Sequence, residues 1–143
     1  MSEENKAFAR RADEELFNRG SLDVANELFA PNFVFHDPAS GEDWHGPDSV
    51  KQYATMLRAA FPDLYYTVED QIAEGDKVVT RWTVRGTHQG EIEEFGPPTG
   101  KQVELEGITI HRIEGGKIVE EWERYDNLSV MLQLGLVNQG VTP

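Results

Sequence analysis

The feature that most constrains this fold is a change of hydrophobic period near the middle of the chain. Before Pro62, apolar residues recur at helical spacing, as Phe8, Ala12 and Leu16 do at intervals of four. From Leu64 onward, stretches rich in β-branched and aromatic residues are separated by turn signals. Helices followed by strands, without a repeating βαβ pattern, favour an α+β fold.

The boundaries of these elements follow from caps, prolines and glycines. The expected helices cover 2–20, 21–31 and 46–61, with a short strand over 33–36. The expected long strands cover 64–72, 77–88, 103–113 and 117–125, before a closing helix or turn over 128–136. A twisted antiparallel meander of this length curls. We therefore predict a strongly curved antiparallel sheet wrapped around the N-terminal helices as a cone-shaped barrel, with a ligand pocket inside.

Length and composition exclude several classes of protein. The chain has 143 residues, the usual size of one domain, and we expect a single domain over 1–143. It contains no cysteine, which excludes thiol catalysis, disulfides and thiolate metal sites, and a reducing cytoplasm is the simplest location. The histidines and acids lack the spacing of common metal motifs, so we expect no metal site.

The charge of the chain is strongly negative. A net charge of -13 without a basic stripe disfavours nucleic acid and anionic membranes as partners. No apolar run approaches the ~20 residues that span a bilayer. We expect an acidic, well-solvated surface, and adaptation to high salt is an alternative explanation of the same charge.

Short motifs are spread in order over nearly the whole chain. They are Phe35-His36-Asp37-Pro38, Phe61-Pro62-Asp63-Leu64, Gly86-Thr87-His88-Gln89-Gly90, Pro98-Thr99-Gly100-Lys101, Gly116-Lys117-Ile118-Val119-Glu120-Glu121-Trp122 and Met131-Leu132-Gln133-Leu134-Gly135. Taken together, they resemble the SnoaL-like polyketide cyclases (ester cyclases) of the nuclear-transport-factor-2-like superfamily. The resemblance implies an NTF2-like (cystatin-like) barrel with a mostly apolar pocket, no metal and no organic cofactor. It also implies an aspartate that acts as general acid/base, matching Asp126, and a histidine partner, matching His111.

The residues themselves leave the role of Asp126 open. If the strand period holds from Ile118, then Trp122 and Asp126 share its buried face. A carboxylate beside an indole in a poorly hydrated pocket has a raised pKa, which suits proton transfer near neutral pH. Alternatively, Asp126 caps the following helix. His111 either orients Asp126 or donates to a substrate oxygen, or it is simply satisfied by a backbone carbonyl.

Five further side chains are candidates for substrate binding. They are His36, Tyr53, Trp82, His88 and Trp122. The histidines end predicted strands and have a loop or surface role as the alternative, whereas Trp82 is either a stacking platform or core. For Tyr53, a hydroxyl directed into the pocket competes with simple packing of an amphipathic helix.

Two functions fit this interpretation. The first is an enzyme, related to a lyase or isomerase, that performs cofactor-free acid/base chemistry such as aldol-type cyclisation on a carbonyl-containing apolar substrate. The second is a binding protein that holds a small apolar organic ligand in the same pocket without catalysis. The resemblance further implies a homodimer that associates through the outer face of the sheet.

Overall fold

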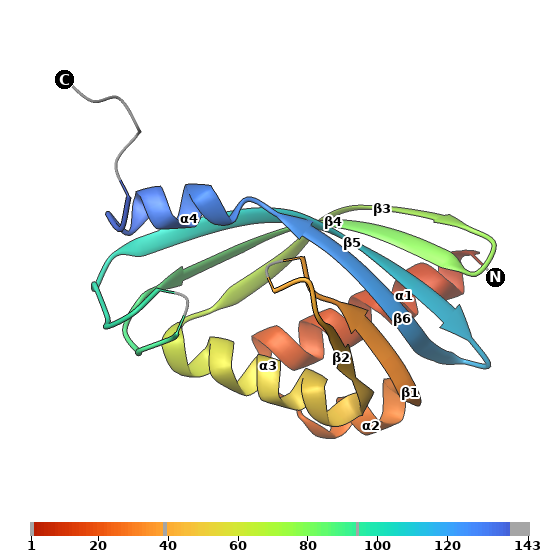
Figure 1. Cartoon of the computed structure of the whole chain (residues 1–143). Helices are drawn as coiled ribbons and strands as arrows, with labels where there is room; N and C mark the ends of the chain where they lie inside the picture. The colour runs from red at the N-terminus through yellow and green to blue at the C-terminus, as the bar shows by residue number, and fades with distance from the viewer. Residues whose placement is uncertain (1, 39, 94, 138–143) are drawn as a thin grey trace.

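The computed structural model describes residues 2–38, 40–93 and 95–137 and shows a curved six-stranded sheet with helices on its concave side (Figure 1). The helical elements are α1 (Ser2–Asp13), the π-helical turn η1 (Glu14–Asn18), α2 (Asp23–Leu28), α3 (Gly46–Ala60) and α4 (Asn127–Gln133). The strands are β1 (Phe29–His36), β2 (Asp43–His45), β3 (Tyr65–Glu74), β4 (Lys77–Thr87), β5 (Gln102–Glu114) and β6 (Lys117–Tyr125). The predicted α+β class is confirmed.

The sheet order is β2-β1-β6-β5-β4-β3, so the predicted meander of four long strands forms one continuous surface. Strands β3 to β6 are antiparallel neighbours, whereas β1 pairs with β6 in parallel. The short edge strand β2 was not predicted. None of the helices in the described ranges is long and apolar enough to cross a membrane.

The boundary between α2 and β1 lies earlier than predicted. We expected the second helix to continue to Pro31, but it ends at Leu28, and Phe29 is already extended with φ -106° and ψ 138°. The residue before a proline avoids the helical region, so Ala30 favours a strand. As a result, Phe29 joins Phe33 on the buried face of β1, where the two rings pack edge to face at 4.9 Å.

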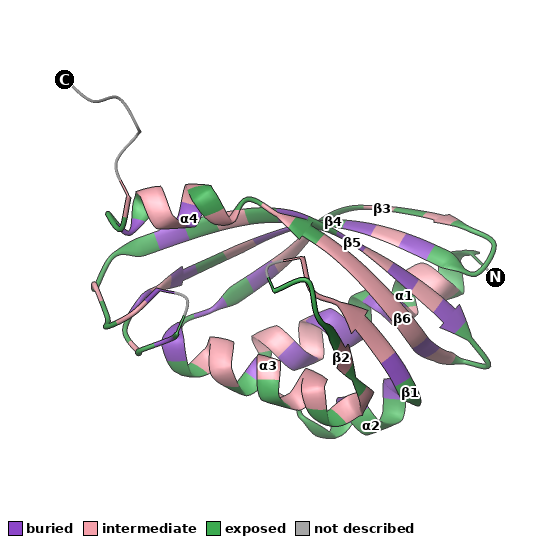
Figure 2. Cartoon of the chain, in the orientation of Figure 1, coloured by how far each residue is buried: buried purple, intermediate pink, exposed green. Residues whose placement is uncertain are grey.

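Buried residues gather in two clusters (Figure 2). One cluster packs the N-terminal helical elements against the sheet, and includes Leu16, Leu28 and Ile118. The other lies towards α4, and includes Phe61, Phe95 and Val130.

A β-bulge in β6 decides which of its side chains face the helices. Ile118 pairs with Ile113, but Glu120 already pairs with Arg112, so Val119 is an extra residue on β6. An extra residue reverses the alternation of the strand beyond it. The prediction that one unbroken period runs from Ile118 to Asp126 is therefore wrong. Beyond the bulge, the odd-numbered residues of β6 face inward.

The loop after β4 lies directly against the end of α3. The amides of Gln89 and Gly90 both donate to the carbonyl of Ala60, at 2.9 and 3.0 Å. A Cβ atom at Gly90 would lie 2.2 Å from the carbonyl oxygen of Ala59. Only glycine allows this approach of loop and helix.

We predict that Gly90→Ala lowers the free energy of unfolding by about 1–3 kcal/mol, because the added methyl group collides with backbone that cannot rotate away. Gln89→Ala, at the exposed neighbouring position, keeps the backbone bond and should cost less than about 0.5 kcal/mol. Urea denaturation of both variants measures the difference. Equal stability of the two variants would show that the contact is not tight in solution.

Candidate functional site

A cavity of about 520 Å³ lies between the helices and the concave face of the sheet. Most of its wall is apolar, formed by Leu16, Phe17, Phe29, Phe33, Phe35, Val50, Tyr53, Met56 and Ile92. These residues come from η1, β1, α3 and the loop after β4. The size and lining suit a small, largely apolar organic molecule.

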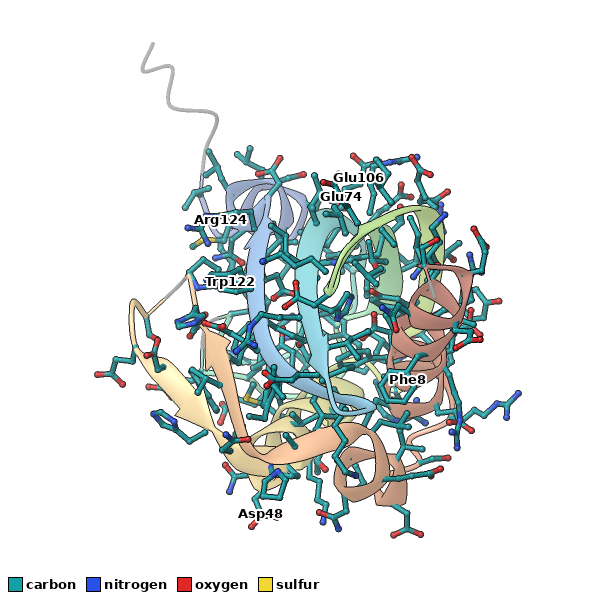
Figure 3. All side chains as sticks on the ribbon, turned by 90° about the vertical axis from the view of Figure 1, so that its right-hand side faces the viewer. Phe8, Asp48, Glu74, Glu106, Trp122 and Arg124 are labelled. Atoms are coloured by element: carbon teal, nitrogen blue, oxygen red, sulfur yellow. The ribbon has the colours of Figure 1, made fainter. Side chains whose placement is uncertain are left out.

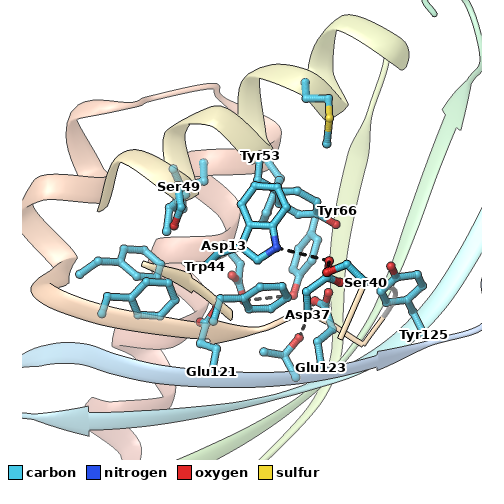
Figure 4. A pocket seen from close by; sticks show the side chains of 18 of the residues that line it. Asp13, Asp37, Ser40, Trp44, Ser49, Tyr53, Tyr66, Glu121, Glu123 and Tyr125 are labelled. Atoms are coloured by element: carbon cyan, nitrogen blue, oxygen red, sulfur yellow. Dashed lines mark hydrogen bonds between the residues drawn. The ribbon is translucent and has the colours of Figure 1, made fainter. Parts of the chain in front are cut away.

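One wall of the cavity is polar. Glu121 and Glu123 face it from β6, Thr109 from β5, Tyr66 from β3 and Asp13 from the end of α1 (Figure 4). The inward direction of the two glutamates follows from strand pairing, because Glu123 lies opposite Thr109. The bulge in β6 thus places two carboxyl groups on the same wall as Asp13.

His111 lies directly behind this wall and is fully buried. Its Nδ1 is 2.5 Å from a carboxylate oxygen of Glu121, and its Nε2 is 3.1 Å from the hydroxyl of Thr80 and 3.7 Å from Asp13. Burial alone would lower the pKa of His111, but the charge and hydrogen bond of Glu121, together with the charge of Asp13, raise it to about 9. The ring is therefore an imidazolium at neutral pH.

The carboxyl group of Asp13 has a pKa close to neutral pH. Burial raises its pKa to about 7, against the opposing attraction of His111. The hydroxyl of Tyr66 donates to its Oδ2 at 3.0 Å. Burial and the adjacent Asp13 in turn raise the pKa of Tyr66 well above its ordinary value, so the phenol keeps its proton.

Glu123 is the second carboxyl group of the cavity wall whose pKa is raised. Burial and the charge of Glu121 raise its pKa to about 8, while the hydroxyl of Thr109, which donates to Oε1 at 3.0 Å, opposes the rise. Glu123 therefore holds a proton at pH 7. Two carboxyl groups with different proton affinities face the same cavity, which is the arrangement that acid/base catalysis requires.

Asp37, Ser40 and Trp44, which follow β1 in the chain, also line the cavity. The indole N–H of Trp44 donates to Asp37 at 3.3 Å. The hydroxyl of Ser40 donates to the same carboxylate at 2.8 Å. Figure 4 shows Asp37 and Ser40 near Glu123 and Tyr125, with the Trp44 indole directed to Asp37.

Of the two roles that the sequence left open for Asp126, the structure shows the helix cap and not the inward-facing acid. Asp126 is exposed, and its carboxylate accepts the amide hydrogen of Ser129 at 3.0 Å as the N-cap of α4. It lies at a groove on the outer face of the sheet instead of in the cavity. The physical reason is the extra residue Val119, which reverses the faces of β6.

The same reversal moves Trp122 away from the cavity. Trp122 and Arg124 project from β6 (Figure 3), and the Trp122 ring stacks on His36 with centroids 5.4 Å apart. His36 contacts Asp43 through Nδ1 at 2.8 Å and Glu120 through Nε2 at 2.6 Å. The Glu120 and Asp43 hydrogen bonds raise the pKa of His36. Neither His36 nor Trp122 lines the cavity, in contrast to the prediction.

The other predicted residues divide into one that lines the cavity and three that do not. Tyr53 on α3 lines it, as expected. His88 is buried away from it and accepts the amide of Thr99 at Nδ1. Trp82 is core and stacks on Tyr66, with centroids 5.7 Å apart. His111 contacts the polar wall from behind but is not part of the lining.

The predictions missed Asp13, Glu121 and Glu123. One signal was present for Asp13, because it follows the buried Ala9 by one helical turn and thus lies on the apolar face of α1. The inward direction of Glu121 and Glu123 could not be predicted from the strand period, because the bulge reverses it. Across the described ranges, no group of three or more His, Asp or Glu is arranged to hold a metal ion.

Comparisons with known proteins agree on one family. The family model of the SnoaL-like polyketide cyclases matches residues 7–134. The aklanonic acid methyl ester cyclase DauD of Streptomyces sp. strain C5 is 28% identical over 127 residues, which cover 85% of this chain and 76% of DauD.

Two solved structures are similar along almost the whole chain. AclR of Streptomyces galilaeus, proposed to be a hydroxylase, has a TM-score of 0.83 at 29% identity and covers 100% of this chain and 87% of its own. IdmH of Streptomyces antibioticus, proposed to be a polyketide cyclase, has a TM-score of 0.79 at 33% identity, with 92% and 98% covered.

The raised pKa of Glu123 has a consequence for stability. The folded protein keeps this proton up to about pH 8, whereas an unfolded chain loses it near the ordinary value of 4.5. The contribution of Glu123 to stability is therefore fully present below pH 4.5 and is lost as the pH rises to 8.

Because glutamine does not ionise, we predict that Glu123→Gln gains stability relative to the parent protein between pH 5 and pH 8, by roughly 2–4 kcal/mol at about 1.4 kcal/mol per pKa unit. His111 and Asp13 are present in both proteins and largely cancel in the difference. Urea denaturation at both pH values measures it. Glu69→Gln on the exposed face of β3 is the matched control. A difference that does not change with pH would contradict the assigned protonation of Glu123.

Proposed function

Because the chain belongs to the SnoaL-like polyketide cyclase family, we propose that it catalyses acid/base chemistry on a carbonyl-containing, largely apolar small molecule. The reaction is an aldol-type cyclisation, an isomerisation or a related proton transfer, and it uses no metal or organic cofactor. The observation that carries this proposal is the pair of buried carboxyl groups, Asp13 and Glu123, on one wall of an apolar cavity.

In this proposal, Asp13 is the general base. With a pKa of about 7, half of the molecules carry it as a carboxylate at neutral pH, and it is basic enough to remove a proton next to a carbonyl. The imidazolium of His111, 3.7 Å away, and the hydroxyl of Tyr66 stabilise that carboxylate. His111 and Tyr66 thus position and tune the base.

Glu123 is the general acid. Burial and the charge of Glu121 raise its pKa to about 8, so it carries a proton at neutral pH. A protonated carboxyl group in a poorly hydrated wall can donate to the oxygen on which negative charge develops. Glu121 remains paired with His111 and takes no direct part.

The lining indicates which substrates enter. No Lys, Arg or His is among the described lining residues, whereas five acidic residues are: Asp13, Asp37, Glu93, Glu121 and Glu123. A free carboxylate would be repelled, whereas a neutral ester would not. The similar cyclase DauD is named for a methyl ester, which makes a neutral polyketide ester the substrate class that we propose. The different activity proposed for AclR shows why the fold alone does not identify the reaction.

We predict that Asp13→Asn and Glu123→Gln each reduce turnover of aklanonic acid methyl ester, the first substrate to test, by about 10²–10⁴-fold, the range of general acid/base effects. Asp126→Asn should retain activity, because the asparagine side chain still caps α4 at an exposed position. Chromatography of the cyclised product measures all three variants, with melting temperatures as the folding control. An inactive, well-folded Asp126→Asn would restore the acid/base role that the family resemblance implies for it.

A non-catalytic binding protein is the second candidate. The observation in its favour is that the acid matching the family's catalytic aspartate, Asp126, lies at the surface. Mass spectrometry of a ligand that purifies with the protein distinguishes the two candidates. A ligand that stays unchanged on incubation supports binding alone, and conversion to a product supports the enzyme.

We also propose that the protein is a cytoplasmic homodimer, associated through the outer face of the sheet. Two large apolar side chains are exposed there on β3 and β5, which are separated by β4: Ile72 at 64% and Ile108 at 46%. We predict that sedimentation shows a dimer at micromolar concentration, and that Ile108→Asp converts it to a monomer. A parent protein that sediments as a monomer contradicts the proposal.

A further inference from the structure

Behind the polar wall, a buried chain of hydrogen bonds leads to Glu123. The indole Nε1–H of Trp82 donates to the hydroxyl of Thr109 at 2.9 Å, and that hydroxyl donates to Oε1 of Glu123 at 3.0 Å. Trp82 and Thr109 are each only 4% exposed. Trp82 itself does not line the cavity, so it contacts the site only through its neighbours.

The indole of Trp82 fixes the direction of the first hydrogen bond in this series. An indole N–H can only donate, so the oxygen of Thr109 must accept from Trp82. Accepting from Trp82 leaves the single hydroxyl hydrogen of Thr109 available to donate, and it donates to Oε1 of Glu123 at 3.0 Å. The acidic proton of Glu123 must consequently lie on Oε2, the oxygen that Thr109 does not contact.

The strand next to Trp82 is shaped to hold the indole in place. A Cβ atom at Gly107 would lie 2.3 Å from Cζ2 of Trp82, so only glycine leaves room for the ring against β5. On its other side, the ring stacks on Tyr66 with centroids 5.7 Å apart. The position of the N–H donor is therefore constrained from both sides.

We propose that Trp82 is a positioning residue that orients the Glu123 carboxyl group through Thr109, so that the acid delivers its proton from Oε2. The role of Glu123 as the acid rests on the proposed function, whereas the orientation of its carboxyl group does not. Trp82 touches no substrate in this arrangement. It acts by donating to one of the two lone pairs of the Thr109 oxygen, which polarises the hydroxyl and strengthens its donation to Glu123.

The groups that face Glu123 are the same in every variant used to test this. They are Asp13 from α1, His111 from β5 and Glu121 from β6, and all three influence its titration. Changes at Trp82 or Thr109 leave these charges in place. A change in the titration of Glu123 then reports on the hydrogen-bond chain.

The test is a carboxyl ¹³C NMR titration of ligand-free protein labelled at glutamate, with the Glu123 signal assigned by its loss in Glu123→Gln. Thr109→Val removes the hydroxyl at constant shape and should raise the midpoint of Glu123 by about one pKa unit, the effect of one hydrogen bond to a charged group. Thr109→Ser keeps the hydroxyl and should leave the midpoint within about 0.3 units. Trp82→Phe should also raise it, because the Thr109 hydroxyl then loses the indole donor that strengthens its hydrogen bond to the Glu123 carboxylate.

Gly107→Ala provides a check that removes neither hydrogen-bonding group. Its methyl group displaces the indole, so it should raise the midpoint in the same direction as Trp82→Phe. Unchanged midpoints in folded Trp82→Phe and Thr109→Val would overturn the inference. If the Glu123 midpoints shift but turnover of the ester does not change, the hydrogen-bond chain from Trp82 to Glu123 is supported. The assignment of Glu123 as the general acid then fails.

Discussion

The site depends on the one-residue bulge at Val119, because it determines which side of β6 faces the helices. Without the extra residue, Glu120 and Trp122 would share the inward face with Ile118. With it, Glu121, Glu123 and Tyr125 line the cavity, while Trp122 lies on the other face beside His36. Bulges next to active sites commonly redirect side chains in this way. The one extra residue thus places two carboxyl groups, Glu121 and Glu123, on the inward face of β6.

Burying several acids together is costly unless their charges are compensated or removed. This protein uses both solutions in adjacent positions. Glu121 is compensated by the imidazolium of His111, whereas Glu123 holds its proton and Asp13 lies between the two states. At neutral pH this leaves a protonated carboxyl group and a partly ionised one on the wall of one largely apolar cavity. Strained electrostatics of this kind are typical of functional sites.

The surrounding fold explains how such a site stays ordered. Strand pairing holds His111 opposite Glu121 and Thr109 opposite Glu123, so two hydrogen bonds of the site follow directly from the β5–β6 register. The rings of Tyr66 and Trp82 support the same wall from β3 and β4. The apolar wall comes from β1 and α3, so changes in its shape would alter the space for a ligand without disturbing the acids.

The sequence by itself determined the fold class, the order of helices and strands, the family and the apolar character of the interior, because hydrophobic period, turns and motifs are local signals. It also identified His111 and Tyr53 as residues near the site. Only the tertiary structure decided that Asp13 and Glu123 meet there and that Asp126 caps α4. A bulge is set by pairing with a neighbouring strand, and a pKa by the surroundings that folding assembles, so neither can be read from the order of residues along one strand.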